Sequence, residues 1–247
     1  MKLSRPQDAI HRGQIYQLLI EIADNPFLAK NLIFKGGTCA ALLKKLDRFS
    51  VDLDFDLLPD ANQTQLDSHL KKIFTTLDLT IKDSSQKVLQ YYLKYKVPTK
   101  QHSMRNTLKL DAVNTVFQAD TFTPQFLADI DRYFVCQNIE TMFAHKLVAL
   151  TNRYDKHKSI AGRDLYDIHY FFLSGHSYNS AIIVERTGLT PLAYFHRLLE
   201  FIQKKVTQTI INQDLNFLIE ANKFKSLRKS LKPQVITLIK DEIQRLT

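Results

Sequence analysis

The chain has 247 residues, of which 45% are hydrophobic and 24% are charged, with six glycines and seven prolines. This length and composition exclude a disordered, fibrous or linker-rich protein and indicate one large or two small globular domains. Residues 1–144 hold 18 basic and 16 acidic groups (+2), whereas residues 145–247 hold 16 and 9 (+7). A basic half favours a polyanionic partner, such as nucleic acid or nucleotide phosphate, although a solvated lysine-rich surface has the same composition.

The cysteines and the hydropathy of the sequence indicate the compartment in which the protein acts. Cys39 and Cys136 are far apart in sequence and form no CxxC pair, so the sequence predicts neither a metal–thiolate site nor a disulfide framework. The first residues lead into a polar helix, and no segment approaches the ~18–20 apolar residues that a membrane span requires. We therefore expect a cytoplasmic protein with no membrane partner.

Helices and strands alternate in the first half of the chain. Apolar residues at helical spacing predict a helix over 8–24 that ends at Asn25-Pro26. A short apolar strand at 32–34 then precedes Gly36-Gly37. The elements that follow are a helix over 38–46, a strand over 51–56, a helix over 64–77, and strands over 86–97 and 106–113.

Strand patterns stop at Asn138, which is a plausible N-cap for a helix that runs to about Arg153. A second helix follows Gly162, and residues 190–246 read as three more helices, the last starting near Pro233. The predicted fold class is therefore α+β, with an α+β domain over 1–137 and an all-helical basic domain over 138–247.

The segment Val51–Asp56 alternates strictly between apolar and acidic residues, which places Asp52, Asp54 and Asp56 on one face of a strand. Alternate residues lie roughly 6.5–7 Å apart. Such carboxylates repel each other unless a cation such as Mg²⁺ lies between them. The alternative interpretation is an edge strand with a solvated polar face.

Three further features favour a magnesium–nucleotide site. Gly36-Gly37-Thr38 follows a buried strand and opens a helix, so its backbone N–H groups could face an anion. Asp111 lies on another alternating strand and could complete a carboxylate trio. Arg48 and Ser50 precede the acidic strand, where a cation and a hydroxyl could contact phosphate oxygens.

These segments, Phe34–Thr38 and Asp47–Phe55, resemble the first motif of the AbiEii/AbiGii toxin family, whose relatives include the mycobacterial MenT toxins. The resemblance implies a nucleotidyltransferase-type, polymerase β-like mixed sheet. It also implies that Mg²⁺ (or Mn²⁺) is held by Asp52, Asp54 and Asp111. A nucleoside triphosphate would then meet the turn residues and their neighbours: Gly36, Gly37, Thr38, Arg48 and Ser50.

In the helical half, spacing places Lys146 and Arg153 on one side of a helix, and Asp164 and Asp167 on one side of the next. Ion pairing alone would account for this pattern. The segments are also similar to the family's KLxAL…R and RDxxD elements, with a longer loop over 154–161. The resemblance implies that Lys146 and Arg153 bind nucleotide, that Asp164 or Asp167 is needed for activity, and that the helical domain completes the active site.

The function expected from these features is transfer of NMP from NTP to an RNA acceptor. The resemblance suggests the tRNA 3′ end as the acceptor. It also suggests that the chain is the toxin of a bacterial toxin–antitoxin or phage-defence pair with a cognate antitoxin. Alternatives are a transferase acting on a small molecule, such as an aminoglycoside, or on a protein side chain, and a non-catalytic nucleic-acid-binding module. Clustered carboxylates argue against the binding module, because they would repel a polyanion.

Overall fold

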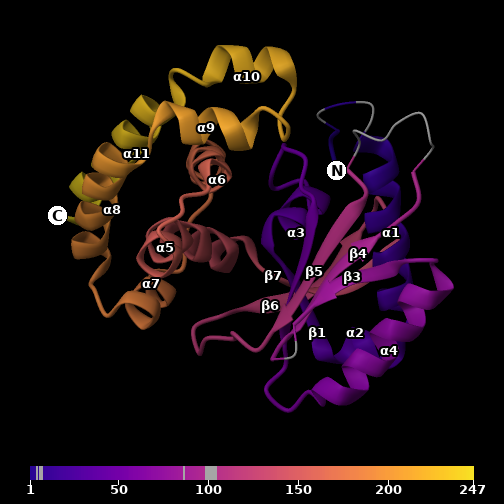
Figure 1. Cartoon of the computed structure of the whole chain (residues 1–247). Helices are drawn as coiled ribbons and strands as arrows, with labels where there is room; N and C mark the ends of the chain where they lie inside the picture. The colour runs from indigo at the N-terminus through magenta and orange to yellow at the C-terminus, as the bar shows by residue number, and fades with distance from the viewer. Residues whose placement is uncertain (4, 6–7, 86, 98–104) are drawn as a thin grey trace. The chain divides into compact units, whose positions relative to one another are not determined.

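The computed structural model describes residues 1–3, 5, 8–85, 87–97 and 105–247, and its chain divides into two compact units (Figure 1). The sheet unit comprises Met1–Val116 and Phe122–Gln137. The helical unit comprises Phe117–Thr121 and Asn138–Thr247. The sequence division between residues 137 and 138 takes no account of the short segment Phe117–Thr121, which belongs with the helices.

A seven-stranded mixed sheet with the order β3-β4-β5-β2-β1-β7-β6 forms the centre of the sheet unit. Strand β2 runs parallel to β5 and antiparallel to β1, so it is an interior strand. This placement excludes the edge-strand interpretation of the acidic segment. The elements of the unit are α1 (Asp8–Asp24), α2 (Pro26–Asn31), β1 (Leu32–Lys35), α3 (Gly36–Leu42), β2 (Asp52–Leu57), α4 (Gln63–Thr76), β3 (Thr80–Ser84), β4 (Leu89–Lys94), β5 (Thr107–Val113), β6 (Phe122–Leu127) and β7 (Arg132–Gln137).

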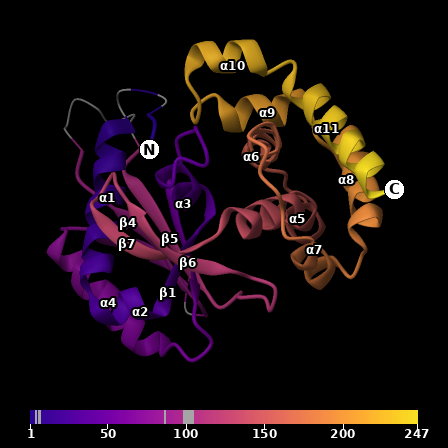
Figure 2. The same ribbon diagram turned by 180° about the vertical axis from the view of Figure 1, so that it is seen from behind.

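The two faces of the sheet differ sharply in polarity. On the core face, the ring of Phe34 lies 5.1 Å from that of Phe55 and 5.5 Å from that of Phe134, measured between centroids. Helix α1 contacts β5 and β7, α2 contacts β1, α3 contacts β1 and β2, and α4 contacts β3 and β4 (Figures 1 and 2). The opposite face, which we call the polar face, carries Lys35, Asp52, Asp54, Asp56, Lys109 and Asp111, because these residues alternate with buried apolar ones.

The helical unit is built around α6, which packs against α5, α9 and α11. Asn138 caps α5 as the sequence predicts, since its side chain accepts a hydrogen bond from the Thr141 backbone N–H at 3.0 Å. None of the helices in the described part of the chain is long and apolar enough to cross a membrane. The helices of the unit are α5 (Ile139–His157), α6 (Gly162–Leu173), α7 (Ser180–Thr187), α8 (Pro191–Lys205), α9 (Gln208–Leu215), α10 (Ala221–Leu227) and α11 (Leu231–Leu246).

The short segment Phe117–Thr121 is held in the helical unit by side chains of α5 and α7. The backbone N–H groups of Gln118 and Ala119 donate to the Glu185 carboxylate at 2.8 and 3.0 Å. Arg186 donates to His145 Nδ1 at 2.8 Å, so the Nε2–H of His145 donates to Asp120 at 2.7 Å. The segment is therefore fixed to helices that follow it in the chain by up to about seventy residues.

Several predicted elements differ from the structure in extent or number. Helix α3 ends at Leu42 instead of residue 46, and the strand expected over 86–97 covers only Leu89–Lys94 within the described residues. The expected loop over 154–161 begins with the last turn of α5, which ends where Lys158 adopts a left-handed conformation. Residues 190–246 form four helices instead of three, because α9 and α10 are separate short helices.

Candidate active site

The glycine turn between β1 and α3 packs directly against the acidic strand. Gly36 has φ of +78°, a conformation that strongly favours glycine, and a Cβ there would lie 2.5 Å from Asp54 Oδ2. A Cβ on Gly37 would lie 2.8 Å from Arg48 Nη2 and 2.9 Å from Ser50 Oγ. Both glycines are therefore required because side chains approach the turn closely: Asp54 at Gly36, and Arg48 and Ser50 at Gly37. The turn, Arg48, Ser50 and Asp54 form one packed arrangement, as their sequence pattern suggests.

Arg48, Ser50 and Thr38 are largely shielded from solvent. Arg48 is 2% exposed, and its Nη1 donates to the Phe49 carbonyl at 2.9 Å. The Thr38 hydroxyl donates to the backbone carbonyl of Asp52, which fixes the start of α3 to the start of β2. These residues shape the turn and hold β2 against it. Whether they also contact phosphate remains a prediction.

The register of β2 against β5 brings two of the three expected carboxylates side by side. Asp54 lies directly opposite Asp111, and Asp52 lies opposite Lys109. Paired residues of neighbouring strands share a face and lie about 4.8 Å apart along the sheet. The parallel pairing of β2 with β5 therefore places Asp54 and Asp111, which are 57 positions apart in sequence, within reach of a common cation.

Asp111 is only partly satisfied in the structure. Its Oδ2 is ion-paired with the ammonium of Lys109, a residue that the sequence patterns did not single out. Its Oδ1 is buried and has no hydrogen-bond partner among the described residues. An uncompensated buried carboxylate oxygen is costly and commonly marks a site for a missing ion or water.

The donor set suits a hard divalent cation. No cluster of three or more His, Cys, Asp or Glu side chains that could hold a metal occurs within the described ranges. Mg²⁺, however, is usually bound through one or two carboxylates and completes its shell with water and substrate phosphates. Asp54 beside the glycine turn and the unpartnered Oδ1 of Asp111 fit that requirement.

The third acidic residue of the strand, Asp56, has a different environment. It is 1% exposed and accepts hydrogen bonds from Thr115 at 2.6 Å and from Gln137 at 2.8 Å. The ammonium of Lys35 forms an ion pair with the same carboxylate. Asp56 therefore joins β1, β2 and β7 on the polar face, and its buried partners account for it as a structural residue.

In the helical unit, Lys146 of α5 lies against both aspartates of α6. Its Nζ is 2.8 Å from Asp164 Oδ1 and 3.1 Å from Asp167 Oδ2, and Arg153 Nη2 is 3.6 Å from Asp164 Oδ2. Asp164 and Asp167 are 1% and 0% exposed. Burial acts to raise the pKa of Asp164, but the charges of Lys146 and Arg153 outweigh it and lower that pKa. The interhelical ion pairs expected from spacing are therefore present, and they hold Lys146 by its ammonium.

The two cysteines, which are distant in sequence, are both buried and free. Burial raises the pKa of Cys39 well above its ordinary value, and a hydrogen bond with Cys136 acts in the same direction. Cys39 follows the glycine turn on α3, and Cys136 lies on β7 opposite Phe34. The pair thus belongs to the packing beneath the turn.

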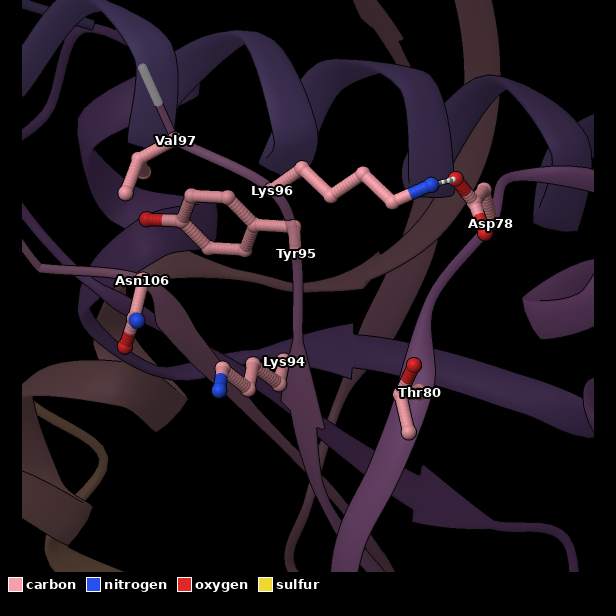
Figure 3. A pocket seen from close by; sticks show the side chains of 7 residues that line it. All are labelled: Asp78, Thr80, Lys94, Tyr95, Lys96, Val97 and Asn106. Atoms are coloured by element: carbon pink, nitrogen blue, oxygen red, sulfur yellow. Dashed lines mark hydrogen bonds and ion pairs between the residues drawn. The ribbon is translucent and has the colours of Figure 1, made fainter. Parts of the chain in front are cut away.

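A cavity of about 390 Å³ lies beyond the end of β4 and contains none of the predicted site residues (Figure 3). Lys96 pairs there with Asp78 at 2.5 Å, and both side chains are mostly exposed. The cavity is lined by Asp78, Thr80, Lys94, Tyr95, Lys96, Val97 and Asn106.

Comparisons with known proteins agree with these features. The family described as nucleotidyl transferase AbiEii toxin, type IV toxin–antitoxin system, matches residues 17–241. The crystal structure of JHP933 from Helicobacter pylori is similar, with a TM-score of 0.59 and 21% identity over 98% of this chain and 94% of that one. A second H. pylori structure, described as a candidate nucleotidyltransferase, has a TM-score of 0.59 and 22% identity over 98% and 99% of the chains.

No match was found among curated proteins. The two structures share the fold, and the family match spans nearly the whole chain, including the glycine turn, the acidic strand and the Lys146 cluster. The chain therefore belongs to the AbiEii family of nucleotidyltransferase toxins of type IV toxin–antitoxin systems.

Proposed function

We propose that this nucleotidyltransferase uses Mg²⁺ or Mn²⁺ to transfer NMP from NTP to an RNA acceptor, with the tRNA 3′ end as the first candidate. The observation that carries the metal assignment is the cross-strand pair of Asp54 and Asp111. Asp54 packs on the Gly36 turn, and Asp111 presents an unpartnered buried oxygen. As a family toxin, the chain would act in the cell opposite a cognate antitoxin, with phage defence as one setting.

In this proposal Asp52, Asp54 and Asp111 hold the metal, which would neutralise charge on the nucleotide phosphates as the reaction proceeds. The acceptor hydroxyl oxygen forms a bond to the α-phosphorus, and the bond from that phosphorus to the bridging oxygen breaks, so pyrophosphate leaves. Asp111 is the carboxylate best placed to accept the hydroxyl proton, because its Oδ1 has no other hydrogen-bond partner in the described chain.

The remaining predicted residues bind phosphate. Gly36, Gly37 and Thr38 bring the backbone close to the metal ligands, and Arg48 and Ser50 supply a cation and a hydroxyl at the same turn. In the helical unit, Lys146 takes the phosphate-binding role that the family implies, with Arg153 as a second cation. Asp164 and Asp167 orient the Lys146 ammonium through contacts of 2.8 and 3.1 Å.

An RNA acceptor is supported by the charge of the helical unit. Helix α10 has no buried residue and carries Lys223 and Lys225, with Arg228 and Lys229 directly after it. Lys223 Nζ lies 5.4 and 5.7 Å from the ring centroids of Tyr166 and Tyr170. A basic surface of this kind would neutralise several phosphates of a polyanion.

A labelled-nucleotide experiment tests the reaction. Purified protein is incubated with each labelled NTP, Mg²⁺ and total RNA, and the label is located by gel and sequencing. We expect Asp54→Ala to abolish transfer without loss of folded structure, because it removes a ligand and also relieves repulsion between carboxylates. Asp83→Ala, which removes an exposed carboxylate from β3, serves as the control. Full transfer by Asp54→Ala at saturating Mg²⁺ would exclude the metal assignment.

The acceptor is tested through salt dependence. On a single strand, each phosphate contact contributes about 0.7 to the log–log slope of affinity against salt. Lys225→Glu/Lys229→Glu should weaken RNA binding and flatten that slope while leaving nucleotide binding intact. The control, Lys72→Glu/Lys82→Glu, changes the net charge equally on exposed lysines of the sheet unit. Normal, salt-insensitive transfer by the first variant would favour a small-molecule or protein acceptor instead.

A further inference from the structure

Lys109 lies among the proposed metal ligands on the polar face. It is directly opposite Asp52 and two residues before Asp111 on the same side of β5. Its ammonium is ion-paired with Asp111 Oδ2 and lies 5.8 Å from the ring centroid of Tyr92. The Lys109 and Asp111 side chains are only 28% and 19% exposed, so this pair is less screened by water than a typical surface ion pair.

The neighbouring carboxylates keep Lys109 charged. Burial is the largest single influence and acts to lower the pKa of Lys109, but Asp111, Tyr92 and Asp54 together raise it. Lys109 contributes a permanent positive charge where a divalent cation is expected to bind.

The two carboxylate oxygens of Asp111 lie in different environments. Oδ2 is neutralised by Lys109, whereas Oδ1 is buried and unpartnered within the described residues. A divalent cation shared by Asp54 and Asp111 would place two positive charges beside the Lys109 ammonium. Because neighbouring like charges repel strongly in a partly buried site, the ammonium and the metal compete for the Asp111 carboxylate.

We propose that Lys109 is an internal counter-cation of the metal site, which neutralises Asp111 in the metal-free protein and is displaced from it when a divalent cation binds. This inference rests on the proposed function. Its consequence is that the metal alone binds weakly, because it must break the Lys109–Asp111 pair. Nucleotide phosphates strengthen metal binding, since they supply a new anionic partner for the released ammonium. Lys109 is thus a positioning residue that couples metal binding to nucleotide binding.

The test measures Mn²⁺ binding to the full-length protein without nucleotide, by the electron paramagnetic resonance signal of free Mn²⁺. Lys109→Met removes the charge with little change in side-chain length and should tighten Mn²⁺ binding by roughly tenfold or more. Lys109→Arg keeps the charge and should bind Mn²⁺ like the wild type. Lys96→Met removes a lysine from an exposed ion pair with Asp78 beyond β4 and should also match the wild type.

Nucleotide coupling provides a second readout. Adding a non-hydrolysable NTP should strengthen Mn²⁺ binding more in the wild type than in Lys109→Met, because only the wild type has an ammonium to release. Circular dichroism verifies that each variant is folded. Unchanged or weaker Mn²⁺ binding by folded Lys109→Met would overturn the proposal.

Asp54→Asn separates this failure from failure of the proposed function. If Asp54→Asn abolishes Mn²⁺ binding while Lys109→Met leaves it unchanged, the metal site stands and only the counter-cation role is wrong. If Asp54→Asn has no effect on Mn²⁺ binding in either background, the metal assignment itself is wrong, and the role of Lys109 fails with it.

Discussion

The buried ion pairs between α5 and α6 give a quantitative prediction for Asp164→Asn. This change keeps the shape of a side chain that is 1% exposed but removes the charge that faces Lys146 at 2.8 Å and Arg153 at 3.6 Å. Breaking one side of a buried pair typically costs about 3–5 kcal/mol. In a chain of this size, 1 kcal/mol corresponds to about 2–4 °C in Tm. We therefore expect Asp164→Asn to lower Tm by roughly 10 °C.

A double-mutant cycle isolates the contribution of the pair. Lys146→Met, Asp164→Asn and the double variant are unfolded in urea and followed by circular dichroism. The double variant should lose less stability than the sum of the single variants, with a coupling energy of about 2 kcal/mol, because the Lys146–Asp164 pair can be lost only once. Asp167 loses its contact with Lys146 in both variants that carry Lys146→Met, so that cost cancels in the cycle. Arg153→Gln is the control, since its side chain is 40% exposed and its contact is longer. It should cost under about 1 kcal/mol.

Coupling near zero, with Asp164→Asn within about 0.5 kcal/mol of the wild type, would refute this reasoning. It would mean that water screens Lys146 from α6, as at an ordinary surface ion pair. The same variants, assayed for transfer, distinguish the aspartates. If the aspartates act by orienting Lys146, the loss of transfer activity in Asp164→Asn should scale with its coupling energy to Lys146. Asp167→Asn should show the same relation between lost activity and coupling energy.

Three other predictions concern the sheet unit. Gly36→Ala should destabilise the protein by about 1–2 kcal/mol in urea unfolding and displace Asp54, so that Mn²⁺ binding weakens. The control is Gly175→Ala: Gly175 has φ of +70° and open space around it, so this change should cost backbone strain but leave Mn²⁺ binding unchanged. Burial lowers the pKa of His11 to about 4, so the stability that neutral His11 provides is complete above pH 6.5 and is lost as pH falls toward 4. That loss of unfolding free energy is on the order of 3 kcal/mol and should be absent in His11→Gln. If stability falls with pH equally in His11→Gln and in the wild type, the prediction is wrong. A thiol reagent at pH 8 should label Cys39 and Cys136 only on unfolding, and rapid labelling of the native protein would show that the pair is accessible.

Local patterns in the sequence predict the elements that carry their own signals. Helix α1 ends at Asp24 because Asn25-Pro26 follows, and Asn138 caps α5 as its residue type predicts. Strand β2 shows a clear alternation because one of its faces is apolar. In contrast, β3 has five exposed residues and therefore no hydrophobic alternation to detect. Strand β6 contains Pro124 on an exposed edge, which weakens its strand pattern.

The candidate site was predictable in residue type but not in pairing. The acidic strand, the glycine turn and the Lys146 cluster follow from spacing within single segments. The register that sets Asp54 opposite Asp111 depends on packing of strands far apart in sequence, and no local pattern encodes it. Lys109 and Asp111 share one side of an alternating strand, which the sequence does indicate, but the position of Lys109 opposite Asp52 depends on the same register. The same limit applies to Asp56, whose buried partners come from β1, β7 and the segment after β5.

The segment Phe117–Thr121 has a consequence for the order in which the protein can mature on the ribosome. Its backbone is synthesised before β6 and β7, yet the Glu185 carboxylate that accepts from Gln118 and Ala119 emerges more than sixty residues later. Until then, a short piece of nascent chain between two strands of the sheet remains without its final partners. A fragment that stops at residue 137 would keep the same gap permanently. Completion of the connection from β5 to β6 therefore waits for α7.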